Sequence, residues 1–205
     1  MTTADGPAGG PAVVVVPATA ERWADVVTLL GSGGERGCWC ESWRGTSSEV
    51  GRGEPDRNRQ LLRSQIEGGA FAPGVIAYRG AEPVGWCGLG PRDAMPRLTR
   101  SRTIPRIDDR PVWSIGCFVV QTGYRRQGLT RRLLDGAVAY ARSMGATCLE
   151  GYPIDPQGDR VSTSFGFVGF TSVFEAAGFR RVLLTDAHSA GLPRWLLRMD
   201  LETEA

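Results

Sequence analysis

The fold is decided by residues 117–134, which read CFVVQTGYRRQGLTRRLL. The apolar start predicts the end of a buried strand, Gly123 and Gly128 predict a tight turn, and the spaced leucines predict an amphipathic helix. N–H groups at a helix start have no intrahelical partner and attract anions, and Gly128 lets a phosphate approach the backbone closely. Four arginines add positive charge: Arg125, Arg126, Arg131 and Arg132. The stretch therefore predicts a phosphate-bearing ligand.

Two common phosphate motifs are absent. The P-loop requires a lysine, and all 24 basic residues of this 205-residue chain are arginines. The dinucleotide fingerprint G-x-G-x-x-G fails because only Gly123 and Gly128 follow the strand. The lack of lysine also excludes Schiff-base chemistry on a lysine. The sequence therefore lacks the motifs that would support nucleotide hydrolysis or hydride transfer.

The rest of the chain predicts alternating strands and helices. We expect strands over residues 12–17, 74–78, 83–88, 113–120, 147–152, 179–184 and 194–201. We expect helices over residues 19–30, 56–66 and 168–177, with a further one that starts at Leu129 and stops at Gly145. This order predicts an α/β fold, with one mixed sheet and helices on both faces. Residues 1–11 predict a mobile tail, and residues 12–205 a single domain.

Two motifs give the chain a family resemblance. Arg125-Arg126-Gln127-Gly128-Leu129 fits the pattern [QR]-x-x-G-x-[GA], although Thr130 stands where Gly or Ala is expected. Phe174-Glu-Ala-Ala-Gly-Phe179 looks like the aromatic-Glu-x-x-Gly-Phe ending of a last helix. Both motifs resemble those of the GCN5-related N-acetyltransferase (GNAT) superfamily.

The resemblance implies a mostly antiparallel sheet with a V-shaped splay between the fourth and fifth strands. The pantothenate arm of acetyl-CoA, the co-substrate, would enter that gap. The positions carried over for its binding are Phe118, Val119, Val120, Arg125, Arg126, Gln127, Gly128, Leu129, Thr130 and Phe174. The implied activity is acetyl transfer from acetyl-CoA to a primary amine of a small molecule, and the alternative is a non-catalytic acyl-CoA sensor or scaffold. Relatives are often homodimers.

The resemblance does not identify the residue that acts as the general acid. Relatives use a tyrosine to protonate the leaving thiolate, and here that position is Phe174, which cannot donate a proton. Ser172 and Tyr152 are the substitutes we consider, with Cys117 and water as further alternatives. Against these roles, Ser172 can be a plain surface hydroxyl, Tyr152 a packing residue and Cys117 an inert buried thiol.

An acceptor pocket is predicted at Cys38-Trp39-Cys40-Glu41-Ser42-Trp43. Trp39 and Trp43 suit an ammonium group through cation–π contact, and Glu41 could bind the amine and accept its proton. The alternative is a packed hydrophobic corner in which both tryptophans face the core and Glu41 lies in solvent.

The composition of the chain argues against several further classes of site and of function. Five cysteines without metal-ligand spacing predict buried free thiols, and we expect neither a disulfide framework nor a metal site. A formal net charge of +2 argues against nucleic-acid binding. No apolar run reaches 18 residues and no secretory signal is visible, so we expect a cytoplasmic protein without a membrane segment.

Overall fold

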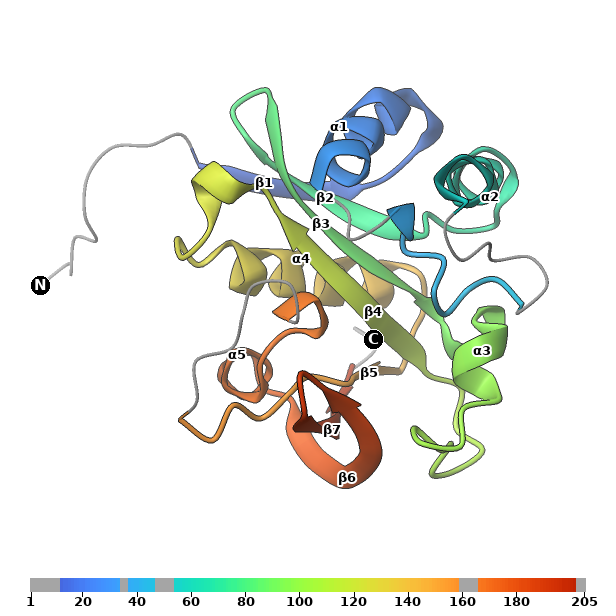
Figure 1. The fold of residues 1–205 in the computed structure, drawn as a ribbon, viewed down its shortest axis with the longest axis vertical. Helices are drawn as coiled ribbons and strands as arrows, with labels where there is room; N and C mark the ends of the chain where they lie inside the picture. The colour runs from blue at the N-terminus through green and yellow to red at the C-terminus, as the bar shows by residue number, and fades with distance from the viewer. Residues whose placement is uncertain (1–11, 34–36, 47–53, 159–165, 202–205) are drawn as a thin grey trace, which may run out of the picture.

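A computed structural model describes residues 12–33, 37–46, 54–158 and 166–201. Its seven strands form one sheet in the order β1-β2-β3-β4-β5-β7-β6 (Figure 1). The strands are β1 (Val13–Pro17), β2 (Gly74–Arg79), β3 (Glu82–Pro91), β4 (Trp113–Val120), β5 (Cys148–Gly151), β6 (Arg180–Ser189) and β7 (Leu192–Asp200). All neighbours are antiparallel except β4 and β5, which are parallel. The predicted mixed, mostly antiparallel sheet is confirmed.

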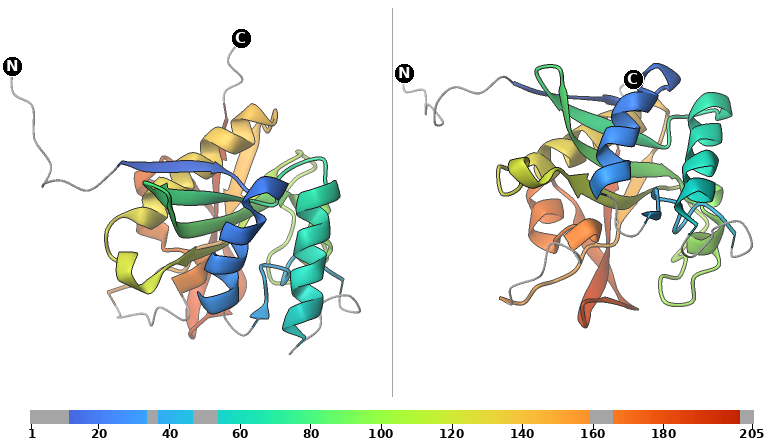
Figure 2. Two further views of the ribbon diagram at one scale, coloured as in Figure 1. Left: turned by 90° about the horizontal axis from the view of Figure 1, so that it is seen from above. Right: turned by 45° about the horizontal axis from the view of Figure 1, so that its top comes forward.

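Helices cover both faces of this sheet, as predicted (Figures 1 and 2). The α-helices are α1 (Trp23–Gly33), α2 (Pro55–Gly68), α3 (Pro96–Thr99), α4 (Leu129–Ser143) and α5 (Thr171–Ala176). Short 3-10 turns are η1 (Ala20–Arg22), η3 (Arg92–Ala94), η4 (Thr122–Tyr124) and η5 (Gly166–Val168). α1 and α2 lie on one face with the chain before α2, and α4 and α5 lie on the other.

Helix α4 packs along its predicted apolar stripe. The buried side of the helix consists of Leu129, Leu133, Leu134, Ala137 and Ala141. Gly136 brings it close to β1, because a Cβ at this position would lie 2.3 Å from Val15 Cγ1. The helix is therefore held against β1–β4 along its length, which fixes its N-terminus beside the end of β4.

Strands β4 and β5 separate after two paired positions. Trp113 pairs with Leu149 and Ser114 with Glu150, and no further pair joins the two strands in the described part of the chain. The β3–β4 register shifts next to Gly88, which leaves Gly116 as an extra residue in β4. This is the splay predicted between the fourth and fifth strands, with a β-bulge at its closed end.

Other expectations need correction. The predicted helix over 168–177 consists of η5 and the shorter α5, because the chain bridges from Phe170 to Ile154 between them. Strand β6 does not stop at residue 184 but continues to Ser189 through an irregular pairing with β7. The predicted mobile tail, residues 1–11, lies outside the described residues.

The prediction of five free thiols is wrong. Cys40 and Cys117 form a disulfide bond, whereas Cys38, Cys87 and Cys148 are free. The two bonded residues are 77 positions apart, and the fold brings the loop before α2 onto β4. Spacing along the sequence carries no information about such a pair.

Candidate active site

The predicted phosphate turn follows β4 directly. Gly128 is the N-cap residue of α4 and has a left-handed φ of 74°. The first helical bonds at this end are donated to its carbonyl by the N–H groups of Arg131 and Arg132. The amides of Leu129 and Thr130 precede these bonds, so they lie at the positive end of the helix dipole. A Cβ on Gly128 would meet no atom within 4 Å, so there is open space beside this residue.

Side chains of the same turn hold its shape. Arg125 Nε donates to Val120 O at 3.1 Å, and Gln127 Nε2 donates to Gly123 O at 3.0 Å. Arg79 Nη1 donates to Gln127 Oε1 at 2.9 Å and so ties the turn to β2. Arg125 and Gln127 therefore stabilise the backbone of the turn.

The other arginines of the turn divide into two kinds. Arg131 pairs with Asp135 at 2.7 Å and donates to Ala176 O at 2.5 Å, which joins α4 to α5. Arg126 and Arg132 are exposed and have no ion pair among the described residues. Arg126 and Arg132 can therefore offer their charge to an anion at this turn.

Phe174 fills the floor of the gap between β4 and β5. Its ring is 0% exposed and meets the rings of Phe118 and Phe179 edge to face, at centroid distances of 6.0 and 5.0 Å. A Cβ on Gly151 would lie 2.1 Å from Phe174 Cε1, so only glycine fits at the end of β5. Ser172, two residues before Phe174, is exposed on α5. The gap thus has an aromatic floor, with the Ser172 hydroxyl open to solvent.

Tyr152 lies in a buried polar network on the opposite face of the sheet. Its hydroxyl donates to Glu150 Oε2 at 2.7 Å, accepts from Arg92 Nη1 at 2.9 Å and contacts Ser114 Oγ at 2.8 Å. The side chain is 1% exposed, and burial, followed by the charge of Glu150, raises the pKa of its hydroxyl. The phenol therefore stays protonated, with its proton already donated to Glu150.

The same carboxylate is held by two guanidinium groups. Arg92 Nη1 lies 3.0 Å from Glu150 Oε2, and Arg198 Nη2 lies 2.6 Å from Glu150 Oε1. Arg92 also donates to Leu98 O and Ile104 O, at 3.4 and 2.7 Å. The arginine-rich connection after β3 is therefore folded around one buried arginine. Sequence reasoning missed this network, although Glu150 is a charged residue inside an apolar strand, which is an available signal.

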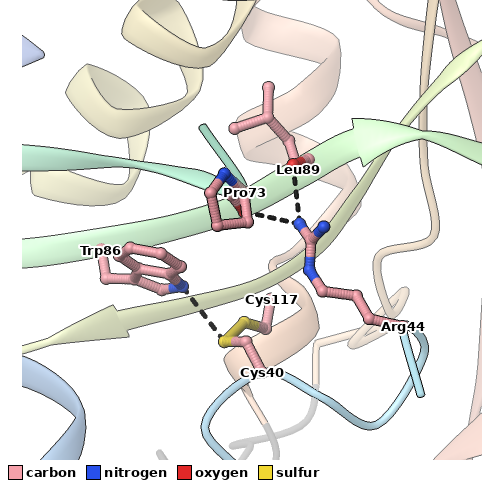
Figure 3. The surroundings of a disulfide bond; sticks show 6 residues. All are labelled: Cys40, Arg44, Pro73, Trp86, Leu89 and Cys117. Atoms are coloured by element: carbon pink, nitrogen blue, oxygen red, sulfur yellow. Dashed lines mark hydrogen bonds between the residues drawn. A yellow bond between two sulfur atoms is a disulfide. The ribbon is translucent and has the colours of Figure 1, made fainter. Parts of the chain in front are cut away.

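The loop before α2 packs over β3 and β4 (Figure 3). Cys40 is bonded to Cys117, and Trp86 Nε1 donates to Cys40 Sγ at 3.1 Å. Arg44 Nη2 donates to Pro73 O at 2.5 Å and to Leu89 O at 2.7 Å. Burial lowers the pKa of Arg44 to about 10, although the nearby Glu41 charge opposes the shift. The loop is thus fixed by one covalent bond and one buried cation.

The predicted acceptor residues do not form one pocket. Trp39 is 5% exposed, stacks on Trp23 at 6.1 Å and has the Arg59 guanidinium 5.8 Å from its ring. Trp43 lies elsewhere, beside Gly116 of β4 and 5.9 Å from the Arg194 guanidinium.

The third predicted acceptor residue is buried as well. Glu41 is 0% exposed and accepts from Gln65 Nε2 at 2.9 Å. The alternative with Glu41 in solvent is therefore wrong, and so is the idea of two tryptophans on one side.

A small cavity of about 10 Å³ lies where the loop meets the bulge of β4. Its lining residues are Cys40, Trp43, Arg44, Gly88, Met95, Gly116 and Cys117. The cavity borders the closed end of the gap, on the face that carries α1 and α2. Met95 and Gly116 escaped the sequence analysis, since only the bulge and the folded connection bring them here.

Two negative findings concern the part of the chain that the structure describes. It holds no group of three or more histidine, cysteine or acidic side chains placed to bind a metal ion. None of its helices has the length and apolar character needed to cross a membrane.

Solved structures share this architecture. An acetyltransferase of the GNAT family from Streptococcus pneumoniae is 13% identical, with 93% of this chain and 100% of that chain covered and a TM-score of 0.53. An agmatine N-acetyltransferase mutant in its apo form is 12% identical over 92% and 99% of the chains, with a TM-score of 0.56. A chain of the NatC complex bound to Gag peptide and CoA is 14% identical over 93% and 99%, with a TM-score of 0.51. At these identities the likeness concerns the fold.

Sequence comparison supplies the family. A search of the curated proteins finds no significant match. The model of the Acetyltransferase (GNAT) family matches residues 39–157, which run from the loop before α2 through the phosphate turn to beyond β5. This segment is more than half of the 205 residues. The chain therefore belongs to the GNAT family of acetyltransferases.

Proposed function

We propose that the protein transfers an acetyl group from acetyl-CoA to a primary amine of a small molecule. One observation carries this proposal: β4 and β5 pair only at Trp113/Leu149 and Ser114/Glu150 and then separate. Beyond the separation, β4 has no strand partner on this edge among the described residues, and it leads to the helix start at Gly128. A long ligand with an anionic end and an amide-bearing arm suits a strand edge that leads to a helix N-terminus.

The chain offers a distinct contact for each part of CoA. The Leu129 and Thr130 amides and the Arg126 and Arg132 guanidinium groups would hold the pyrophosphate. The backbone of Phe118 to Val120 would pair with the arm, because in the described part of the chain this edge of β4 has no strand partner beyond Ser114. The buried Phe174 ring packs against Phe118 and would support this part of β4. These residues would suit CoA, and the acetyl group would come from acetyl-CoA, as the family assignment implies.

The hydrogen bonds of Tyr152 favour a positioning role for this residue. Its one proton is donated to Glu150, and its oxygen is engaged by Arg92 and Ser114. Proton delivery to the leaving thiolate is then left to water or to Ser172, whose hydroxyl is exposed. Glu41 could meet an amine only if the loop that buries it moved.

The second candidate function is acyl-CoA binding without turnover, as in a sensor or scaffold. It is favoured by Phe174, which occupies the general-acid position with a side chain that cannot donate. The structural relatives themselves include an agmatine N-acetyltransferase and a complex with a peptide, so the fold admits both small and peptide acceptors.

A thiol-release assay decides between these functions. Acetyl-CoA is offered with diamines, aminoglycosides, amino acids and peptides, and free CoA is measured in each case. An enzyme shows amine-dependent release with saturation in the amine, whereas a sensor binds acetyl-CoA in calorimetry and releases nothing. Preference for a peptide amine would overturn the small-molecule assignment while leaving acetyl transfer intact.

A further inference from the structure

The disulfide occupies a position that the acetyl-transfer chemistry does not explain. It joins Cys40 of the loop to Cys117 of β4, next to the extra residue Gly116 at the closed end of the gap. Cys117 is partly exposed, whereas Cys40 is 8% exposed beneath the loop. Of the two sulfur-bearing residues, Cys117 is thus the more accessible.

The surroundings are shaped for this pair of sulfur atoms. A Cβ on Gly88 would lie 3.2 Å from both Cys117 Sγ and Trp86 Nε1, so a larger residue would press on both groups. Trp86 Nε1 donates a hydrogen bond to Cys40 Sγ at 3.1 Å (Figure 3). An N–H donor stabilises a thiolate more than a neutral sulfur, so it makes Cys40 the better leaving group.

The proposed binding mode directs a thiol to this place. With its pyrophosphate at Gly128, CoA would extend back along β4 from Val120 towards Gly116. Cys117 lies three residues before Val120, about 10 Å along an extended strand. The free thiol at the far end of the arm would then reach the half-exposed Cys117 beside the bulge.

We propose that free CoA attacks this disulfide and becomes attached to Cys117, an inference that rests on the proposed function. The CoA thiolate bonds to Cys117 Sγ, the Cys117–Cys40 bond breaks, and Cys40 leaves as a thiolate that takes up a proton. One disulfide replaces another, so no oxidant or reductant is consumed. Acetyl-CoA cannot react in this way because its sulfur is acylated. The modified protein would be blocked by the product form of its co-substrate.

Mass spectrometry of the intact protein tests the proposal. Thiol titration of the denatured protein should first give three free thiols, and five after reduction. Anaerobic incubation with free CoA should add the mass of one whole CoA molecule, with the adduct on Cys117 and a new alkylatable thiol on Cys40. Acetyl-CoA and desulfo-CoA should add nothing, and desulfo-CoA should suppress the reaction of CoA. Glutathione, which lacks the nucleotide, should react at least ten times more slowly.

Two variants control the experiment. Cys38→Ser should still form the adduct, because this neighbouring thiol is outside the disulfide. Cys40→Ser should form none without oxidant, because two thiols cannot form a disulfide unless electrons are removed. Calorimetry with desulfo-CoA shows whether each variant still binds the nucleotide.

Several results would overturn the proposal. They are five free thiols before reduction, an adduct on Cys40 or Cys38, an equal rate with glutathione, or no adduct on a protein that binds desulfo-CoA. A protein that binds neither CoA nor desulfo-CoA would refute the proposed function itself, and this inference with it.

Discussion

Gly128 and Gly145 offer a matched pair of substitutions at the two ends of α4. Both glycines have left-handed backbones, with φ values of 74° and 76°, and a Cβ on either would meet no atom within 4 Å. A non-glycine residue in this conformation costs about 1–2 kcal/mol. Gly128→Glu and Gly145→Glu should therefore both lower the free energy of unfolding, Gly145→Glu somewhat more because its carboxylate lies at the negative end of the helix dipole, and only Gly128→Glu places a carboxylate at the phosphate turn.

The loss of affinity can be worked out from the charge. Two unit charges about 5 Å apart repel by about 1 kcal/mol in bulk water and by about 3 kcal/mol at an effective dielectric of 20. An intermediate value of about 2 kcal/mol weakens binding about 30-fold. Because the turn is exposed, the loss should shrink as salt is added. Gly145→Glu, at the other end of the helix, should keep the affinity of the unchanged protein.

Isothermal calorimetry with acetyl-CoA measures both variants, and thermal unfolding shows that both are folded. If Gly128→Glu binds acetyl-CoA as tightly as Gly145→Glu, the phosphate is held elsewhere. The phosphate turn would then not be the binding site of the pyrophosphate, and the proposed binding mode along β4 would be refuted.

Four further outcomes are expected. Tyr152→Phe should change kcat less than tenfold, because its proton is already donated to Glu150, and a larger loss in a folded variant would make Tyr152 the acid. Glu150→Gln should lower the free energy of unfolding in urea by about 3 kcal/mol, since it leaves the buried Arg92 guanidinium without its carboxylate, whereas Asp108→Asn at the exposed partner of Arg198 should cost much less. Burial and a hydrogen bond to the Asp25 carboxylate raise the pKa of Tyr78 above its unfolded value near 10. The free energy of unfolding should therefore fall as the pH rises past about 10, and it should fall less steeply in Tyr78→Phe. Reducing the Cys40–Cys117 bond should remove about 4.5 kcal/mol from the free energy of unfolding in denaturant melts, the chain-entropy value for a separation of 77 residues, and an unchanged melt would contradict a formed disulfide.

The parts of the fold that sequence predicts well are those set by local chemistry. Strand β4 has the predicted bounds, residues 113–120, and α4 begins at the predicted Leu129. In both elements the apolar period, the turn glycines and the helix start lie within a few residues of one another. The splay was predicted from the family resemblance alone, because no local sequence pattern indicates where two parallel strands stop pairing.

The loop before α2 escaped prediction because its structure depends on distant partners. Arg44 bonds carbonyl groups 29 and 45 positions away, and Cys40 bonds a sulfur 77 positions away. The spacing of Trp39 and Trp43 indicated a shared side only if the segment were helical. Instead Trp39 and Cys40 have left-handed backbones, with φ values of 48° and 59°, and the two rings lie apart.

The loop before α2 and the connection after β3 are both held by a buried arginine, which gives the absence of lysine a structural meaning. Arg44 donates to the carbonyl oxygens of Pro73 and Leu89, and Arg92 donates to two in the connection after β3 while it pairs with Glu150. A guanidinium group has five donors in a fixed plane, so one buried cation can tie several backbone oxygens together. An ammonium group is more strongly hydrated and loses its proton more readily when buried. Even after burial lowers its pKa to about 10, Arg44 remains charged at neutral pH. Two segments with little regular secondary structure are therefore fixed to the sheet by buried arginine side chains.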